Sequence, residues 1–164
     1  MLIEAIVAIS IGVVGLLGFL QLLTQAVSIN KDVGQKFVAV YLAAEGIEIV
    51  KSLVDENYVN DRAWNAALDG GSYELAYDTV SASNFSTATG TTRSANSLFY
   101  HNTTGTYDYS YIAGDSRQTQ FQRTIQITNM RGGQELRVDS IVEWRTRRGT
   151  EEVKLENHFF DWRL

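Results

Sequence analysis

The sequence predicts an α+β protein in which the C-terminal half of a long N-terminal helix packs on a C-terminal antiparallel β-sheet. The first residues form a long apolar run, the apolar positions then recur at three- and four-residue steps, and the end of the chain alternates apolar and polar residues. We divide the 164 residues into an apolar helix segment (1–25), an amphipathic helix (26–57), an irregular region with short strands (58–118) and an antiparallel meander (119–164).

The stretch from Leu2 to Leu23 is almost entirely apolar and is interrupted only by Glu4, Ser10 and Gln21. About 20 apolar residues are enough for a helix to cross a bilayer. The simplest interpretation is a single-pass membrane anchor. A cleaved signal peptide is the competing interpretation, but it calls for a basic start, a shorter apolar region and a small-residue cleavage site.

Neither interpretation accounts for Glu4. A carboxylate at the centre of a membrane costs about 2.5–3.5 kcal/mol, and less near the interface, so an acid in such a run needs a partner. An α-amino group is the nearest candidate. It belongs either to the same chain, whose helix start already favours negative charge, or to another copy.

The residues Met1-Leu2-Ile3-Glu4-Ala5-Ile6-Val7-Ala8-Ile9 resemble the processed N-terminus of type IV pilins and pseudopilins, with a class III-type motif. The stretch Tyr41–Lys51 is similar to the middle of many bacterial pilin helices. The glutamate sits one residue nearer the chain start than is usual in the family. Because the chain shows no basic leader peptide, we expect it to be the mature form.

This resemblance implies a type IV pilin fold and a structural role in an extracellular filament on the cell surface. The implied partners are other copies of the chain in a helical polymer, the inner membrane before assembly, and the pilus assembly machinery. In assembly, Glu4 is expected to pair with the N-terminal amine of a neighbouring subunit, here that of Met1.

Small residues recur within the apolar segment, at Ala8, Gly12, Gly15 and Gly18. Small residues let membrane helices approach closely, and glycine is common in such helices. The chain has no proline, whereas a proline often kinks the helix in the pilin family. The glycines are therefore candidates either for ordinary packing or for the place where the helix loosens during assembly.

Beyond Leu23 the helix is predicted to become amphipathic and to end near Asp55 to Tyr58. Its apolar positions recur at helical spacing, namely Phe37, Val40, Tyr41, Ala44, Ile47 and Val54. These residues define the face that we expect to be buried.

The middle of the chain carries weaker signals. The pattern predicts a turn over 64–71 that ends at two glycines, and it predicts a strand over 73–78. The Ser/Thr-rich stretch 79–97 is expected to be an exposed loop. Tyr107, Tyr109 and Tyr111 alternate with polar residues, which predicts a strand with one aromatic face.

The end of the chain gives the clearest strand signals. Three alternating runs, 121–128, 136–144 and 153–159, are separated by glycine-containing turns at 131–133 and 148–149, and together they predict a meander. The long helix is the only long element available to cover this sheet.

We therefore expect Trp144 and Phe159 to be buried against the helix face that carries Phe37, Tyr41 and Ala44. This contact would place the amphipathic half of the helix on the meander.

Composition argues against several other functions. The net charge of −5 does not favour nucleic-acid binding, and the absence of cysteine excludes disulfides and thiolate metal sites. His101, in a polar loop region, and His158, on the last strand, lack ligands at metal-binding spacing, so we expect no metal and no cofactor. Asn84 and Asn102 match the N-glycosylation pattern, which is frequent by chance.

These observations leave three classes of function open: a pilin of a type IV filament, a pseudopilin of a type II secretion-like machine, and a single-pass membrane protein with an extracytoplasmic binding domain. We do not expect an enzyme, because no constellation of residues supports catalysis. Glu4 favours the first two classes, because an anchor has no use for an acid at its start.

Overall fold

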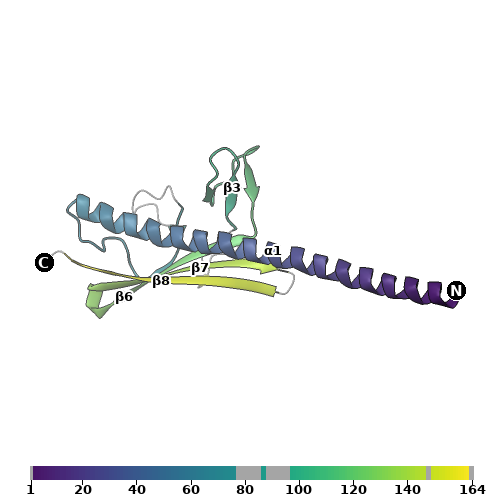
Figure 1. Cartoon of the computed structure of the whole chain (residues 1–164). Coiled ribbons are helices and arrows are strands. Elements are labelled where there is room, and N and C mark those ends of the chain that lie inside the picture. Colours follow the sequence, from purple (N-terminus) through teal and green to yellow (C-terminus); the bar gives the residue numbers. More distant parts are fainter. Residues whose placement is uncertain (1, 77–85, 88–96, 147–148, 163–164) are drawn as a thin grey trace. The chain divides into compact units, whose positions relative to one another are not determined.

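The computed structural model describes residues 2–76, 86–87, 97–146 and 149–162 (Figure 1). It divides into two compact units, Met1–Phe37 and Val38–Leu164. The first consists of the N-terminal part of helix α1 (Leu2–Val59), and the second contains the rest of that helix with all of the strands.

Helix α1 ends at Val59, next to the predicted limit of Asp55 to Tyr58. Its end is closed by the chain that follows. Arg62 N–H donates to the Asn57 carbonyl (2.9 Å), and the Asn57 side chain donates to Trp64 O (3.2 Å) and Ala66 O (3.0 Å). Asp61 adopts a positive φ of 51°, which turns the backbone out of the helix. The bond from Arg62 satisfies a carbonyl of the terminal turn, and the Asn57 side chain holds the following chain against the helix end.

The C-terminal meander is confirmed and forms most of a five-stranded antiparallel sheet with the order β2-β1-β6-β7-β8. The connection between β6 and β7 is a 3₁₀ turn, η2 (Arg131–Gly133), in which Arg131 and Gly132 have positive φ values of 51° and 70°. The strands are β1 (Gly71–Glu74), β2 (Ser86–Thr87), β6 (Phe121–Met130), β7 (Glu135–Thr146) and β8 (Gly149–Phe160).

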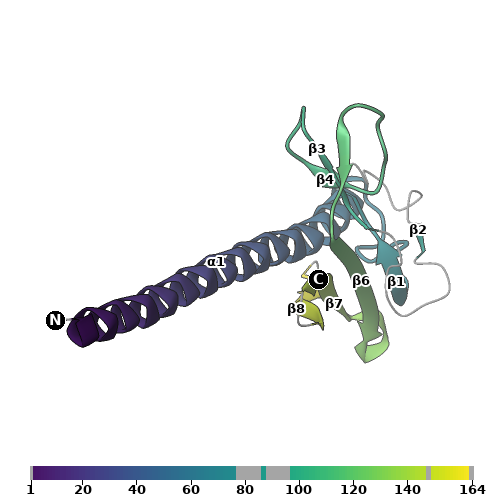
Figure 2. The ribbon, with the colours of Figure 1, turned by 90° about the vertical axis from the view of Figure 1, so that its right-hand side faces the viewer.

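A second, three-stranded sheet has the order β4-β3-β5 (Figure 2). It consists of β3 (Phe99–His101), β4 (Tyr107–Asp108) and β5 (Ser116–Gln118). The strand predicted over Tyr107 to Tyr111 is too long, because Asp108 Oδ1 accepts hydrogen bonds from the backbone N–H (2.8 Å) and hydroxyl (2.9 Å) of Ser110 and so turns the chain.

Two other predictions fall partly outside the described residues. The strand predicted over 73–78 begins earlier, at Gly71, and ends at Glu74, while residues 77 and 78 lie outside. Of the expected loop 79–97, the structure describes β2, which pairs with β1, and Ser97.

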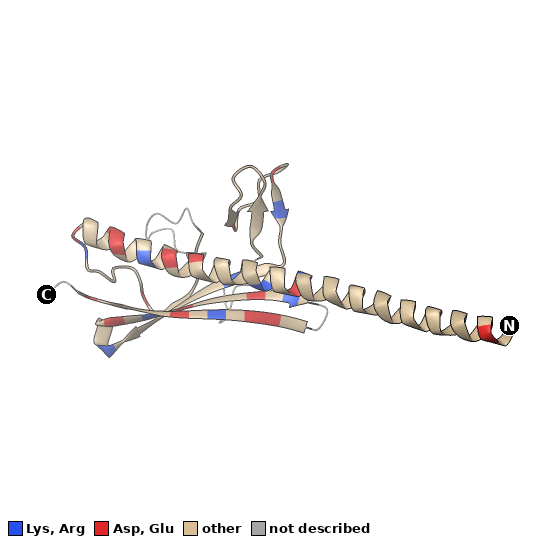
Figure 3. Ribbon diagram, viewed as in Figure 1, with Lys and Arg blue, Asp and Glu red and all other residues tan. Residues whose placement is uncertain are grey.

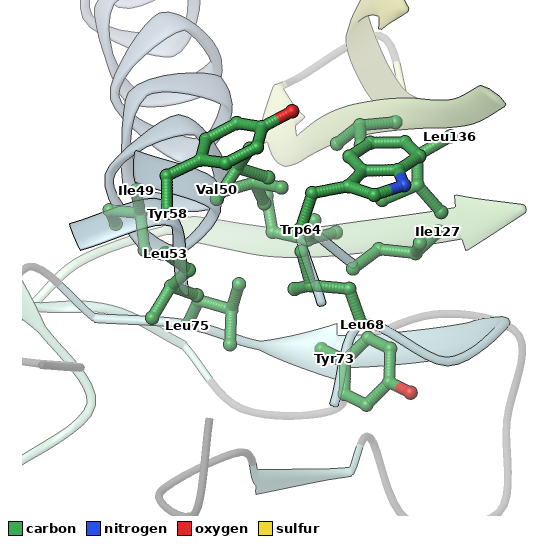
Figure 4. Close-up of a cluster of buried hydrophobic side chains, with 13 residues drawn as sticks. Ile49, Val50, Leu53, Tyr58, Trp64, Leu68, Tyr73, Leu75, Ile127 and Leu136 are labelled. Carbon is green, nitrogen blue, oxygen red and sulfur yellow. The ribbon is translucent and has the colours of Figure 1, made fainter. Parts of the chain in front are cut away.

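The predicted α+β fold is confirmed: the C-terminal half of α1 runs across one face of the meander (Figure 1). One core cluster joins the last turns of the helix to β1, β6 and β7 (Figure 4). Its helix members are Ile49, Val50, Leu53, Val54 and Tyr58, and its other members are Trp64, Leu68, Tyr73, Leu75, Ile125, Ile127, Leu136 and Val138.

The predicted helix face is right towards the C-terminal end, where Val54 is buried and Ile47 packs against the first core cluster, but it is wrong nearer the middle of the helix. Trp144 is buried, with 4% of its surface exposed, but Phe37 and Tyr41 are 62% and 72% exposed. Trp144 belongs to a second core cluster whose members are Ala39, Leu42, Ala43, Leu98, Phe121, Val142 and Trp144. Phe159 is half-buried and packs on the first cluster.

The reason for this error is the size of the residues at the helix–sheet contact. Ala39, Ala43 and Gly46 are buried, and a Cβ on Gly46 would overlap Ser140 Oγ and Ile125 Cδ1. At this level the small residues let the helix approach the sheet closely, while the larger Phe37, Val40 and Tyr41 remain exposed. Further along the helix, larger residues such as Ile49, Val50 and Leu53 make the contact.

Candidate functional site

The apolar segment of α1 carries one charge between Leu2 and Asn30, the carboxylate of Glu4 (Figure 3). The Glu4 side chain is exposed and has no ion-pair partner among the residues that the structure describes. Ser10 Oγ donates to Ile6 O (2.8 Å) and Thr24 Oγ1 donates to Leu20 O (3.0 Å). Since these hydroxyls are satisfied within the helix, Glu4 is the polar group that most needs an external partner in an apolar environment.

The other predicted assembly residues lie on the same continuous helix. Ala8 is exposed, and a Cβ on Gly12, Gly15 or Gly18 would meet no atom within 4 Å. Met1, whose amine is the predicted partner of Glu4, lies outside the described residues. The glycines therefore leave open surface along an uninterrupted helix, and their role in packing or loosening stays a prediction.

By length and composition, α1 contains a segment able to cross a membrane. None of that segment is buried within the chain, and every side chain from Leu2 to Lys31 is exposed. A signal sequence near the N-terminus can meet the same criteria of length and composition. Because exposed apolar surface is unfavourable in water, a helix with this much of it is stable where lipid or other protein covers it.

A buried arginine, which the sequence analysis missed, joins the helix to the sheets. Arg123 on β6 has none of its surface exposed, and its guanidinium lies 3.0 Å from Glu45 Oε2. It also donates to Leu42 O (3.1 Å) and Leu75 O (2.6 Å). The signal was present in the sequence, since Arg123 occupies an inward position of the alternating run that begins at Phe121.

Tyr109 extends this arrangement by donating from its hydroxyl to the Arg123 carbonyl (2.7 Å). Burial is the main reason that the pKa of Tyr109 rises to about 12. The phenol is therefore a fixed donor at physiological pH. Together, Tyr109 and Arg123 connect the chain that follows β4 with the five-stranded sheet.

A second polar cluster surrounds His101, which lies on β3 rather than in a polar loop and is 2% exposed. Its Nε2 lies 2.7 Å from Asp108 Oδ1. Its Nδ1 lies 3.0 Å from Ser116 Oγ and 3.3 Å from Asp115 Oδ2. The hydrogen bond to Asp108 is the largest of the effects that raise the pKa of His101, and burial opposes it.

This cluster contains the residue types of a Ser-His-Asp triad, but its geometry suits another role. Ser116 Oγ accepts the Ile112 N–H (2.7 Å), and the carboxylate of Asp115 faces the ring nitrogen that a nucleophile would use. A raised pKa lets the ring hold its proton to higher pH, and a protonated ring cannot act as a base. Among the described residues, no group of three or more His, Cys, Asp or Glu side chains is arranged to hold a metal.

The outer face of the meander carries the other histidine, as the sequence predicted for the last strand. His158 on β8 lies 2.6 Å from Glu135 Oε1 through Nδ1 and 3.0 Å from Glu156 Oε1 through Nε2. These hydrogen bonds, that of Glu156 first, raise the pKa of His158. Beside them, the buried Asp139 carboxylate lies 3.1 Å from Lys154 Nζ. Charged side chains on this face are therefore paired with one another.

No protein-family model, curated protein or solved structure matches the chain. The functional argument therefore rests on the apolar segment with Glu4 and on the fold.

Proposed function

We propose that this protein is a structural subunit of a type IV pilus-like filament on the cell surface, assembled through its apolar N-terminal helix. In the filament, the Glu4 carboxylate pairs with the N-terminal amine of a neighbouring subunit. The observation that carries the proposal is the single acid in a long apolar helix whose side chains have no covering within the chain.

The energetics favour assembly over simple anchoring. A lone carboxylate destabilises a membrane anchor, because lipid solvates it poorly. In a polymer without water in its core, the same carboxylate has a partner of opposite charge at every subunit step, and that partner is lost when the subunit dissociates. Before assembly the inner membrane covers the apolar segment, and during assembly other copies replace the lipid.

The second unit supplies the outward part of the subunit in this proposal. The long helix that packs its C-terminal half on an antiparallel sheet supports a pilin-like architecture. Its tight helix–sheet contact and buried Arg123 favour a rigid, non-catalytic body, and we propose no enzymatic activity, cofactor or nucleic-acid ligand for it.

Electron microscopy of filaments sheared from cells that make the protein, with mass spectrometry of the filament subunit, tests this proposal. We expect the chain to be the subunit and its true N-terminal residue to carry the paired amine. Short periplasmic assemblies without surface fibres would favour a pseudopilin instead. A monomer that remains in the membrane under all conditions would contradict the proposal and favour an anchored binding protein.

A further inference from the structure

His101 lies where all three strands of the second sheet meet. Its ring comes from β3, Asp108 from β4, and Asp115 and Ser116 from the start of β5. The ring is almost completely buried, and each of its nitrogens faces a carboxylate oxygen, at 2.7 Å for Asp108 and 3.3 Å for Asp115. One imidazole thus connects the whole sheet.

Both carboxylates are held in place by other donors. Asp108 Oδ1 accepts from the N–H and hydroxyl of Ser110, and Asp115 Oδ1 accepts from the N–H (2.8 Å) and hydroxyl (2.6 Å) of Thr103. An ionised carboxylate is only an acceptor, so the ring satisfies both of them only if it donates from both nitrogens. The protonated imidazolium is the form that can donate towards both carboxylates.

The neutral ring also has a partner in this structure. Ser116 Oγ lies 3.0 Å from Nδ1 and already accepts the Ile112 N–H, so its own proton is available for donation to an unprotonated Nδ1. Asp108 would keep the Nε2 proton, and Asp115 Oδ2 would lose its contact with the ring.

We propose that His101, with Asp108, Asp115 and Ser116, forms a pH-dependent hydrogen-bond switch that holds the three-stranded sheet together. We call these four residues the clasp. In the closed state the imidazolium donates to Asp108 and to the Asp115–Ser116 side. When the Nδ1 proton leaves for solvent, the Ser116 hydroxyl turns to donate to Nδ1, and the contact between the ring and Asp115 is released. The clasp therefore sets the rigidity of the turn before β5, where the apolar side chains of Tyr111 and Ile112 are exposed.

Charge around the ring fixes the sign of the pH response. Within the described residues, the charged groups that face the ring are Asp108 and Asp115, while Arg117 lies over Tyr100, at 5.6 Å from its ring centroid. Because the pKa of His101 is raised in the fold, the clasp is complete below the ordinary histidine pKa and is lost as pH rises through the raised value.

The two aspartates set the lower end of the pH range in which the clasp is complete. Hydrogen bonds from Thr103 lower the pKa of Asp115. Burial acts to raise the pKa of Asp108, but hydrogen bonds from His101 and Ser110 outweigh it and lower that pKa. The stability that the two carboxylates add to the clasp is complete above the ordinary aspartate pKa. It is lost as pH falls through the lowered pKa values of Asp108 and Asp115. The clasp is thus strongest between the ordinary pKa values of aspartate and histidine.

Nuclear magnetic resonance of the full chain in detergent micelles, with labelled histidine, tests the clasp directly, because the chain has only two histidines. In the unsubstituted protein we expect the neutral His101 ring to carry its proton on Nε2. We also expect the Thr103 amide to exchange faster with solvent above the transition. A neutral ring protonated on Nδ1 would overturn the proposal without any variant being needed.

Two substitutions are expected to move the His101 titration in opposite directions. Asp115→Asn removes an anionic acceptor and should lower the proton affinity of His101 by roughly tenfold or more. Ser116→Ala removes the donor to the neutral ring and should raise that affinity. His158 is the internal control and should titrate unchanged in both variants. Shifts in the same direction, or no shift from Ser116→Ala, would refute the exchange between Asp115 and Ser116.

Discussion

Gly46 lies where α1 packs closely on the five-stranded sheet. An added Cβ would overlap Ser140 Oγ and Ile125 Cδ1, so Gly46→Ala should push the helix away from β6 and β7. We expect a loss of about 1–3 kcal/mol in the free energy of unfolding, as is usual for overpacking. Chemical denaturation of the full chain in detergent measures this loss.

Gly34→Ala is the matched control, since a Cβ at Gly34 on the same helix meets no atom within 4 Å. This substitution should leave stability unchanged or increase it by up to about 1 kcal/mol, because alanine favours helix more than glycine does. Equal losses from the two substitutions would mean that Gly46 is not a packing position.

Individual buried polar residues were hard to predict from the sequence. Arg123 and His101 look like surface residues by type. Arg123 is buried with Glu45, which lies far along the chain, and His101 is buried with Asp108 and Ser116 in a sheet that was not predicted. Spacing within one segment cannot show such partners. Glu4 was easier to identify, because an acid inside an apolar run is anomalous on its own.

Among the elements, the long ones were predicted well, β1 and β4 were predicted with the wrong limits, and β2, β3 and β5 were not predicted. Helix α1 and strands β6, β7 and β8 repeat their pattern over many residues, whereas β2 and β4 have two residues each and β3 and β5 have three. So few residues cannot establish alternation. The helix face was misjudged for a different reason: its contact with the sheet uses small residues that periodicity arguments underweight.

The contact between Trp144 on β7 and the helix allows a test of the corrected face. Trp144→Ala removes a large side chain that packs with Ala39 and Phe121, and it should cost about 3–5 kcal/mol in the free energy of unfolding. Tyr41→Ala, on the exposed face, should change stability by less than about 0.5 kcal/mol. Denaturation curves of both variants decide between the two faces, and a larger loss from Tyr41→Ala would restore the original prediction.

At the scale of the whole molecule, the chain has one unit with a hydrophobic core and one apolar helix segment that no other part of the chain buries. The second unit buries its apolar residues in two clusters, while the side chains from Leu2 to Lys31 are all exposed. Exposed apolar surface of this extent requires lipid or other protein in its place of action. Under the proposed function, lipid covers this surface before assembly and other copies of the chain cover it in the filament.

The most direct test of the account compares filament yield with membrane-extracted subunit for Glu4→Ala and Glu4→Asp. In the membrane, Glu4→Ala should be neutral or mildly favourable, because it removes a polar group from lipid. In the filament it should remove one partner of a buried pair, at about 3–5 kcal/mol for each subunit step. We predict a normal amount of membrane-extracted subunit and little filament for Glu4→Ala, with partial assembly for Glu4→Asp. A normal filament yield from Glu4→Ala would contradict the charge-pairing role of Glu4.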